Sequence, residues 1–216
     1  MRIKSFQGGY DKNLCYVIWC KKTNLAGVID PSVYPSEIFE FIQKKKLKID
    51  KILVTHTHHD HIKYLDKICE EYPKADIYIS NKTSFNKKEF IGVEDNDMIE
   101  IGENRIHTLF TPGHYKDSLC YWCRDEKAIF TGDTVFVGRT GRTISTGSSI
   151  NKLYYSIYNI ILKLPLETKI YPGHNYGNTK TVTIKENIKS SSFFSCRSFD
   201  EFVSVMDKFE KNRQIG

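Results

Sequence analysis

Long apolar runs, a secretion signal and the dense cysteine pattern of a disulfide scaffold are all missing from this sequence, and each absence excludes a class of protein. No stretch approaches the roughly 20 apolar residues of a membrane-spanning helix, and Met1–Gly9 lacks the apolar segment of a signal peptide. The six cysteines among 216 residues are too dispersed for a disulfide-stapled scaffold, so we expect reduced thiols. We therefore predict a soluble cytoplasmic protein that has no contact with a membrane.

A strong excess of one charge is missing too. The 32 basic and 26 acidic residues leave a net charge of +6, and a basic balance can favour an anionic substrate or a nucleic acid. The sequence has no basic patch interleaved with aromatic residues and no nucleic-acid motif, so we expect no nucleic-acid partner. A hydrophobic content of 40% and an aromatic content of 13% predict a folded globular chain. Its length fits one sizeable α/β domain.

One pair of cysteines has the spacing of a zinc ribbon or a redox motif. Cys120 and Cys123 are separated by two residues, but no second pair accompanies them. They lie in a predicted strand, where positions three apart point to opposite faces. We therefore expect both thiols to pack in the core rather than to take part in chemistry.

Apolar periodicity predicts strands interspersed with helices. The predicted strands are Cys15–Cys20, Leu25–Asp30, Lys51–Val54, Ile77–Ser80, Asn104–Phe110, Ser118–Cys123, Ala128–Thr131 and Lys169–Tyr171. The predicted helices run from Ser36, as the capping residue, to about Lys46, from about Ile62 to Tyr72, and over Asn151–Leu164. The polar stretch 81–96 is predicted to be a surface loop with a short helix. This order indicates sheet layers with helices on both outer faces.

The histidines are concentrated in one short run. The sequence has seven, and four of them fall within residues 56–61, directly after a predicted strand. His56, His58, Asp60 and His61 carry the nitrogen and oxygen donors that bind zinc and similar cations. On extended backbone His56 and His58 point to the same side, and Asp60 and His61 lie where the next helix should begin. A lone histidine is usually structural, whereas this spacing indicates a turn that aims ligands at two neighbouring metal ions.

The run Thr-His-x-His-x-Asp-His at residues 55–61 resembles the signature of the metallo-β-lactamase superfamily. Three further stretches match that family in the same order: Thr111–His114, Phe130–Thr134 and Tyr171–His174. The match extends from about Asn13 to Tyr176 and implies an α/β fold, the αββα sandwich. We expect residues 1–216 to form a single domain of this kind, with a short helical extension at about 178–216.

The resemblance implies seven metal ligands around two divalent ions. His56, His58 and His114 would hold the first ion, Asp60, His61 and His174 the second, and Asp133 would bridge them. The ions would be zinc, with iron or manganese as alternatives, and a bridging water would become a metal-bound hydroxide near neutral pH. Asp60 would also act in catalysis by orienting this nucleophile.

Glycines directly precede three of the ligands, His114, Asp133 and His174. We expect their backbone freedom to allow a sharp turn and a close approach of the metal. The two remaining histidines match no ligand position. We expect His59 to lie either behind the ligands or at the rim of the site, and His107 to be an ordinary strand residue.

Such a site suits hydrolysis of an ester, thioester, amide or lactone without a nucleophilic side chain, and a Gly-x-Ser-x-Gly motif is absent from the sequence. Residues 130–143 resemble the glyoxalase II group, the hydroxyacylglutathione hydrolases, which implies a small glutathione-type thioester as the substrate. Arg142 matches a basic residue that would pair with a glutathione carboxylate, and Tyr176 matches a second substrate contact.

Two features depart from the glyoxalase II pattern. The Gly-Cys-Gly that precedes the basic residue in that group reads Arg139-Thr140-Gly141 here. Only about 40 residues follow His174, too few for the full helical glutathione-binding domain.

The C-terminal part resembles a second group of the superfamily, the persulfide dioxygenases. The matching stretches are Gly141–Thr143, His174–Gly177, Thr181–Glu186 and Phe199–Val203. This alternative implies a single Fe(II) on His56, His114 and Asp133, with glutathione persulfide as the substrate. Both groups retain the histidine run, so the identity of the metal would separate them.

Other classes of protein are weaker alternatives. A nuclease would need an insert large enough to dock RNA, which the sequence lacks. A non-catalytic binding module would have lost at least one ligand, and none is lost. The sequence leaves a homodimer open.

Overall fold

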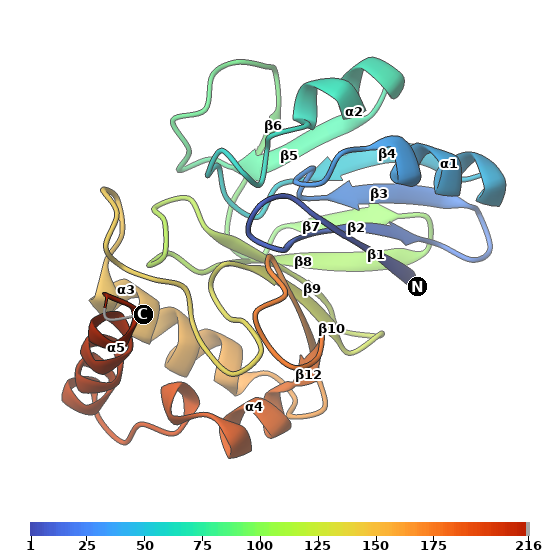
Figure 1. Cartoon of the computed structure of the whole chain (residues 1–216). Helices are drawn as coiled ribbons and strands as arrows, with labels where there is room; N and C mark the ends of the chain where they lie inside the picture. Colours follow the sequence, from blue (N-terminus) through green and yellow to red (C-terminus); the bar gives the residue numbers. More distant parts are fainter. Residues whose placement is uncertain (215–216) are drawn as a thin grey trace.

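The computed structural model describes residues 1–214, which form two six-stranded sheets packed face to face with helices on both outer faces (Figure 1). This arrangement confirms the predicted αββα sandwich.

The first sheet has the strand order β1-β2-β3-β4-β5-β6. Its strands are β1 (Arg2–Gly8), β2 (Asn13–Trp19), β3 (Leu25–Ile29), β4 (Lys48–Leu53), β5 (Asp76–Ser80) and β6 (Ile91–Val93). The pairs β1–β2 and β2–β3 are antiparallel, and the pairs from β3 to β6 are parallel. Helices α1 (Ser36–Lys45) and α2 (Leu65–Glu71) cover its outer face through Ile38, Ile42, Leu65 and Ile68.

The second sheet has the strand order β12-β11-β10-β9-β8-β7. Its strands are β7 (Met98–Ile101), β8 (Asn104–Phe110), β9 (Leu119–Cys123), β10 (Ala128–Gly132), β11 (Lys169–Pro172) and β12 (Val182–Thr183). Only β10 and β11 among them pair in parallel, and the other pairs are antiparallel.

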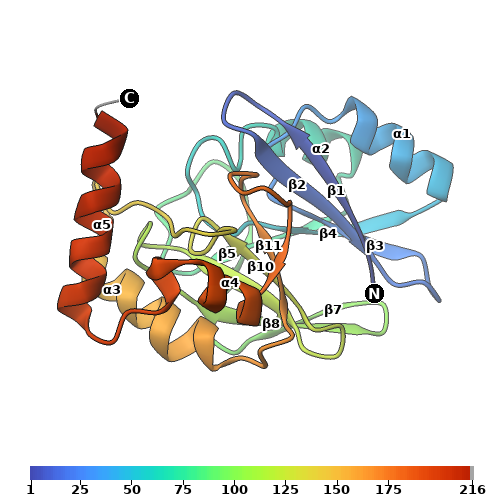
Figure 2. The same cartoon turned by 60° about the horizontal axis from the view of Figure 1, so that its bottom comes forward.

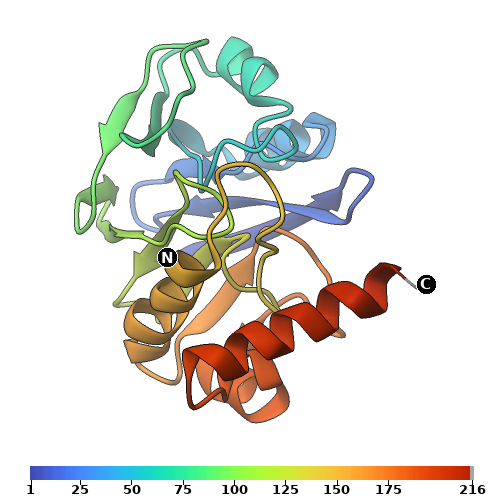
Figure 3. The same ribbon diagram turned by 90° about the vertical axis from the view of Figure 1, so that its left-hand side faces the viewer.

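Helices from the second half of the chain cover the outer face of the second sheet. They are α3 (Ile150–Tyr155), which continues as a π-helical segment (Ser156–Ile160) and a 3₁₀ turn (Ile161–Lys163), then α4 (Ile184–Ser190), a 3₁₀ turn (Ser192–Phe194) and α5 (Phe199–Gln214). Figure 2 shows α3, α4 and α5 on one side of the molecule and α1 and α2 on the other. Figure 3 shows α5 lying alongside α3. No helix within residues 1–214 is long and apolar enough to cross a membrane.

Alternating side chains let the central strands contribute to two cores at once. In β9, Cys120 faces the layer of α3, α4 and α5, while Cys123 faces the space between the sheets. Successive side chains of a strand point to opposite faces of the sheet. The expectation that these two cysteines pack on opposite sides is therefore confirmed, and both are buried free thiols.

Two tyrosines join the sheets to each other in the core between them. The hydroxyl of Tyr16, on β2, donates to the carbonyl of Pro172 on β11 at 2.6 Å. The hydroxyl of Tyr121, on β9, donates to the carbonyl of Val54, just after β4, at 2.9 Å. A buried phenol needs such a partner, and here each partner lies two residues before a histidine.

Three predictions about local structure were wrong. Ser36 is the first residue of α1 rather than its cap, because the capping position is Pro35, which makes no side-chain bond. The second helix begins at Leu65 instead of Ile62, since the residues before it form tight turns after the histidine run. The stretch 81–96 contains no helix but the short strand β6, which extends the first sheet by parallel pairing with β5. The strands β1, β7 and β12 were not predicted either.

Candidate metal centre

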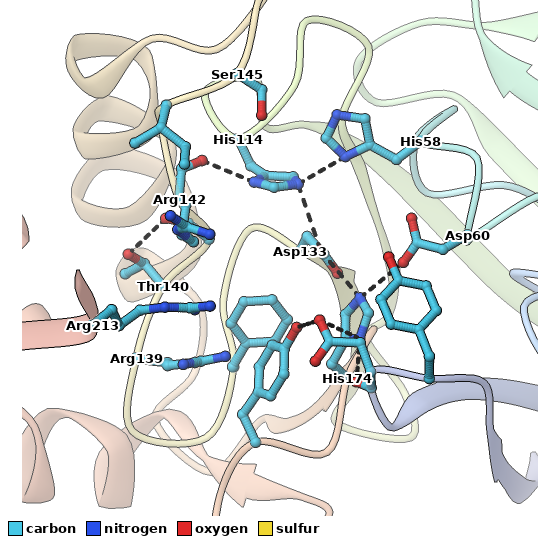
Figure 4. Close-up of a pocket in the computed structure, with 16 residues that line it drawn as sticks. His58, Asp60, His114, Asp133, Arg139, Thr140, Arg142, Ser145, His174 and Arg213 are labelled. Carbon is cyan, nitrogen blue, oxygen red and sulfur yellow. Dashed lines mark hydrogen bonds and ion pairs between the residues drawn. The ribbon is translucent and has the colours of Figure 1, made fainter. Parts of the chain in front are cut away.

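Four segments that end at the same edge of the sandwich bring the predicted ligands together. The histidine run follows β4 of the first sheet, and the three other segments follow β8, β10 and β11 of the second sheet. Each ligand therefore sits on a turn whose preceding strand is held by the core. Figure 4 shows five of these side chains lining one cavity: His58, Asp60, His114, Asp133 and His174.

Three histidines form the first group of potential ligands. Nε2 of His56 lies 3.0 Å from Nδ1 of His58, and Nε2 of His114 lies 3.0 Å from the same atom. Their ring nitrogens are close enough together to share one ion. The structure thus places in one cluster the three residues that the sequence assigned to the first metal.

The second group combines two histidines and a carboxylate. Nε2 of His174 lies 3.3 Å from Nε2 of His61 and 3.3 Å from Oδ2 of Asp60. These three side chains also lie within reach of one ion. Asn13 donates from Nδ2 to Asp60 at 2.8 Å, which fixes the orientation of the carboxylate.

Asp133 lies between the two groups. Its Oδ2 is 3.5 Å from Nε2 of His114 and 3.3 Å from Nε2 of His174, and its Oδ1 is 3.1 Å from Nε2 of His61. Oδ1 is buried and makes no hydrogen bond of acceptable geometry despite that short distance. A buried oxygen without a partner is costly, and a cation at this position would satisfy it. The donor set of imidazoles and carboxylates fits divalent ions such as zinc.

In three of the histidines, Nδ1, the ring nitrogen that points away from the two groups, is hydrogen-bonded to an acceptor elsewhere in the chain. Nδ1 of His114 donates to the carbonyl of Arg142 at 2.9 Å, and Nδ1 of His174 donates to the carbonyl of Asp11 at 2.8 Å. Nδ1 of His61 lies 2.9 Å from Oδ2 of Asp30. These bonds leave Nε2 of each ring free for a metal, as is usual around metal-binding histidines.

Asp30, Asp11 and Asn13 were missed by the sequence reasoning. Asp30 was taken only as the end of a strand, but its carboxylate also accepts from the backbone N–H and the hydroxyl of Thr55, both at 2.7 Å. It follows β3, the parallel neighbour of β4. Since parallel neighbours end at the same edge of a sheet, an acidic residue at that strand end was the signal that could have revealed it.

Two of the glycines act in different ways. Gly132 has a φ of +48° and a side chain there would lie against Thr55, so it needs both backbone freedom and space. Gly173 does not have a positive φ. A Cβ on Gly173 would collide with Oδ1 of Asp133 and lie 2.6 Å from Cε1 of His61. Close approach, rather than a special backbone angle, is therefore the reason for glycine at position 173.

Burial lowers the pKa of some of these histidines, and neighbouring carboxylates raise the pKa of another. Burial lowers the pKa of His56, and it lowers the pKa of His58 to about 4. Burial also disfavours charge on His174, but Asp133 and Asp60 outweigh it and raise the pKa of His174 to about 10. The carboxylate of Asp133 is itself buried, yet His61 and His174 hold its pKa well below the ordinary value. The carboxylates thus favour positive charge at the centre, which a metal ion would supply.

The predicted substrate contacts lie on the wall of the cavity, whose volume is about 200 Å³. The ring of Tyr176 stacks on that of His174 with centroids 4.9 Å apart, and its hydroxyl donates to Asp11. Arg142 lines the cavity too, but its guanidinium donates from Nε and Nη2 to Glu210 of α5, each at 2.7 Å.

The two histidines without a ligand position belong to neither group of potential ligands. His59 is exposed and lies beside a shallow depression that is also lined by Tyr115. His107 is a residue of β8, 6.2 Å from the ring of Trp122.

Comparison with known proteins gives concordant results. A family model described as the metallo-beta-lactamase superfamily matches residues 8–174. The "probable polyketide biosynthesis zinc-dependent hydrolase PksB" of Bacillus subtilis is 31% identical over 195 residues, which cover 88% of this chain and 85% of that protein. The hydroxyacylglutathione hydrolase of Francisella tularensis subsp. novicida is 37% identical over 166 residues, which cover 76% of this chain but only 64% of that protein. Among solved structures, ETHE1 from Myxococcus xanthus has a TM-score of 0.87 at 27% identity, with 97% of this chain and 91% of that chain covered.

Proposed function

The chain belongs to the metallo-beta-lactamase superfamily, in the branch that it shares with the glyoxalase II and persulfide dioxygenase groups, and from this premise we propose that it is a metal-dependent thioesterase. The substrate would be a small thioester of glutathione or of a similar thiol. The hydrolases among its relatives support this choice, since one of them is a hydroxyacylglutathione hydrolase.

One observation carries the proposal: seven potential ligands converge from four segments, and Asp133 lies within 3.5 Å of a histidine in each group. Two adjacent ions fit this donor set, and the Bacillus subtilis relative, a probable zinc-dependent hydrolase, favours zinc. When bound, the metal would lower the pKa of a water and polarise the carbonyl of the substrate.

Asp60 is the residue proposed to act on the nucleophile. Its carboxylate lines the cavity and is held by Asn13, so it can orient a water and accept the proton of that water. The oxygen of the water bonds to the carbonyl carbon, the carbon–sulfur bond breaks, and the departing thiolate takes up the proton. The histidines keep fixed tautomers during this step, because their outer nitrogens stay bonded to Arg142, Asp11 and Asp30.

Arg142 and Tyr176 are proposed to contact the substrate from the cavity wall. Tyr176 lies directly against His174, so a substrate bound at the metal end of the cavity would touch its ring. Arg142 would contribute through the part of its guanidinium that is not bonded to Glu210.

A persulfide dioxygenase with one Fe(II) is the second candidate, and the region after His174 favours it. The stretch Thr181–Glu186 contains a complete capping box between Thr183 and Glu186, and Phe199–Val203 forms the first turn of α5. These are the stretches that resemble persulfide dioxygenases.

Metal analysis and paired assays test the two candidates against each other. The purified protein would be analysed for zinc, iron and manganese and then assayed with S-lactoylglutathione and with glutathione persulfide. The proposal predicts about two zinc ions per chain and release of free thiol from the thioester. One iron per chain with oxygen uptake on the persulfide would establish the second candidate instead.

A further inference from the structure

The side chain of Arg139 lies in the cavity wall, and no carboxylate of residues 1–214 pairs with its charge. Arg139 occupies a position where glyoxalase II enzymes carry glycine, and its guanidinium lines the cavity that holds the metal ligands. Its Nε is buried and makes no hydrogen bond, and no carboxylate within residues 1–214 forms an ion pair with it. A guanidinium remains protonated in proteins, so a buried donor of this kind is costly unless a ligand satisfies it.

Aromatic rings hold this guanidinium in place. Its carbon Cζ lies 3.6 Å from the ring centroid of Tyr176 and 5.4 Å from that of Phe209 on α5. Contact with ring faces stabilises a cation without using up its N–H donors. The side chain is therefore positioned by the protein, while its hydrogen-bonding capacity stays available.

The other arginines of the cavity differ from Arg139. Arg142 already makes two hydrogen bonds to Glu210. Arg213 lies 6.0 Å from the ring of Phe209 and lines the same cavity, so it adds positive charge beside Arg139. Figure 4 shows Arg139 and Arg213 on the same side of the cavity, opposite His58 and Asp60.

We propose that Arg139 determines substrate specificity by binding an oxyanion on the thiol half of the thioester. The substrate class rests on the proposed function: the reacting carbonyl must lie at the metal ligands, which leaves the remote part of the substrate against Arg139. A carboxylate, as in glutathione, or a phosphate, as in coenzyme A, has the oxygen atoms that a guanidinium binds through two N–H groups.

Binding of non-hydrolysable thioethers by the full-length, metal-loaded protein tests this proposal. S-hexylglutathione offers carboxylates, S-hexyl-coenzyme A offers phosphates, and S-hexyl-N-acetylcysteamine is neutral. Calorimetry should show that at least one anionic thioether binds more tightly than the neutral one. Which of the two anionic compounds binds identifies the source of the oxyanion.

Arg139→Gln should weaken binding of the preferred anionic thioether by about 10- to 100-fold, the range for hydrogen bonds to a charged group, and should leave the neutral compound unaffected. Arg105→Gln, an exposed arginine on β8, is the matched control for the loss of one charge and should bind as the wild type does. Equal binding of the anionic compound by wild type and Arg139→Gln would overturn the proposal, and so would equal affinity of the wild type for all three compounds.

Arg139→Lys keeps the inference testable if the glutamine variant does not fold. Lysine retains the charge but not the paired N–H groups, so its affinity should fall between those of the wild type and of Arg139→Gln; affinity equal to that of the wild type contradicts the proposal. Thioethers are not hydrolysed, so a protein that binds them through Arg139 but cleaves no thioester disproves the proposed function alone.

Discussion

The carboxylate of Asp30 lies 2.9 Å from Nδ1 of His61, although the two residues are 31 positions apart in the chain. The same carboxylate holds Thr55, the first residue of the turn that carries the histidines. Asp30 is thus the residue that ties the end of β3 to the ligand-bearing turn.

Asp30→Asn should reduce metal affinity by about 10- to 100-fold, which is the usual effect of losing a residue that orients a metal ligand. The amide has the size of the carboxylate but no charge to stabilise His61. Competition with a chromogenic chelator would measure the affinity. Asp125→Asn, an exposed aspartate in the turn after β9, should bind metal as the wild type does; equal losses in both variants would show that the effect is not specific to the site.

His56→Ala should lower activity by at least about 100-fold. It should also lower the metal content while leaving the fold intact. His56 is buried among the potential ligands, so its loss would leave the first group with two histidines. Elemental analysis and circular dichroism would measure the two effects. His107→Ala, in β8 outside the site, is the matched control. Unchanged turnover of the His56 variant would refute the ligand assignment.

Gly173→Ala should lower both metal content and stability. The new methyl group would collide with Oδ1 of Asp133 and press against His61, and overpacking of this kind costs about 1–3 kcal/mol in the free energy of unfolding. Gly92→Ala in β6 offers a comparison, because its nearest contact would be 3.3 Å from the side chain of Asn81. Thermal denaturation of both variants would distinguish the crowded position from the tolerant one.

Metal binding should strengthen as pH rises from 6 to 9. In the metal-free protein the pKa of His174 is raised to about 10, so a metal must displace a proton from this ring across the whole range. Each proton displaced makes the affinity increase by about tenfold per pH unit. His58, whose pKa is lowered to about 4, is already neutral between pH 6 and 9, so it adds nothing to the change of metal affinity with pH. Calorimetry in buffers of different ionisation enthalpy would count the released protons, and a flat affinity profile would contradict the expectation.

The metal-free protein should show the opposite trend in its own stability. Because the pKa of His174 is raised above its ordinary value of 6.5, its contribution is complete below pH 6.5 and is lost as pH rises towards 10. Urea denaturation after chelation should therefore give a falling free energy of unfolding across this range.

That the seven potential ligands lie close together could be predicted from the sequence, because they follow strands in a fixed order of short motifs. The spacing of the four potential ligands in the histidine run can be read directly from the sequence, and Gly113, Gly132 and Gly173 mark the other three turns. What the motifs do not contain is the set of partners behind the ligands. Asp30 and Asp11 come from segments with no histidine, and only the pairing of β3 with β4 and the turn between β1 and β2 bring them to the site.

The sequence was also silent on how the C-terminal segment reaches the cavity. A helical extension at about 178–216 was predicted, but the pairing of Glu210 with Arg142, 68 residues away, depends on how α5 packs on α3. The late start of α2 has a similar origin. Ile62, Leu65 and Ile68 have the spacing of one helix face, yet the turns that aim Asp60 and His61 at the centre take precedence over local propensity, so the helix begins only at Leu65.

The tyrosine bonds between the sheets have a mechanical consequence. Tyr16 and Tyr121 each reach across to the backbone of the opposite layer, two residues from His174 and His56 respectively. A metal held by both histidine groups would join the same two layers at their edge. Sliding one layer over the other would then strain the metal bonds and both phenol contacts at once, so shear between the layers should resist applied force as a single unit and fail in one step.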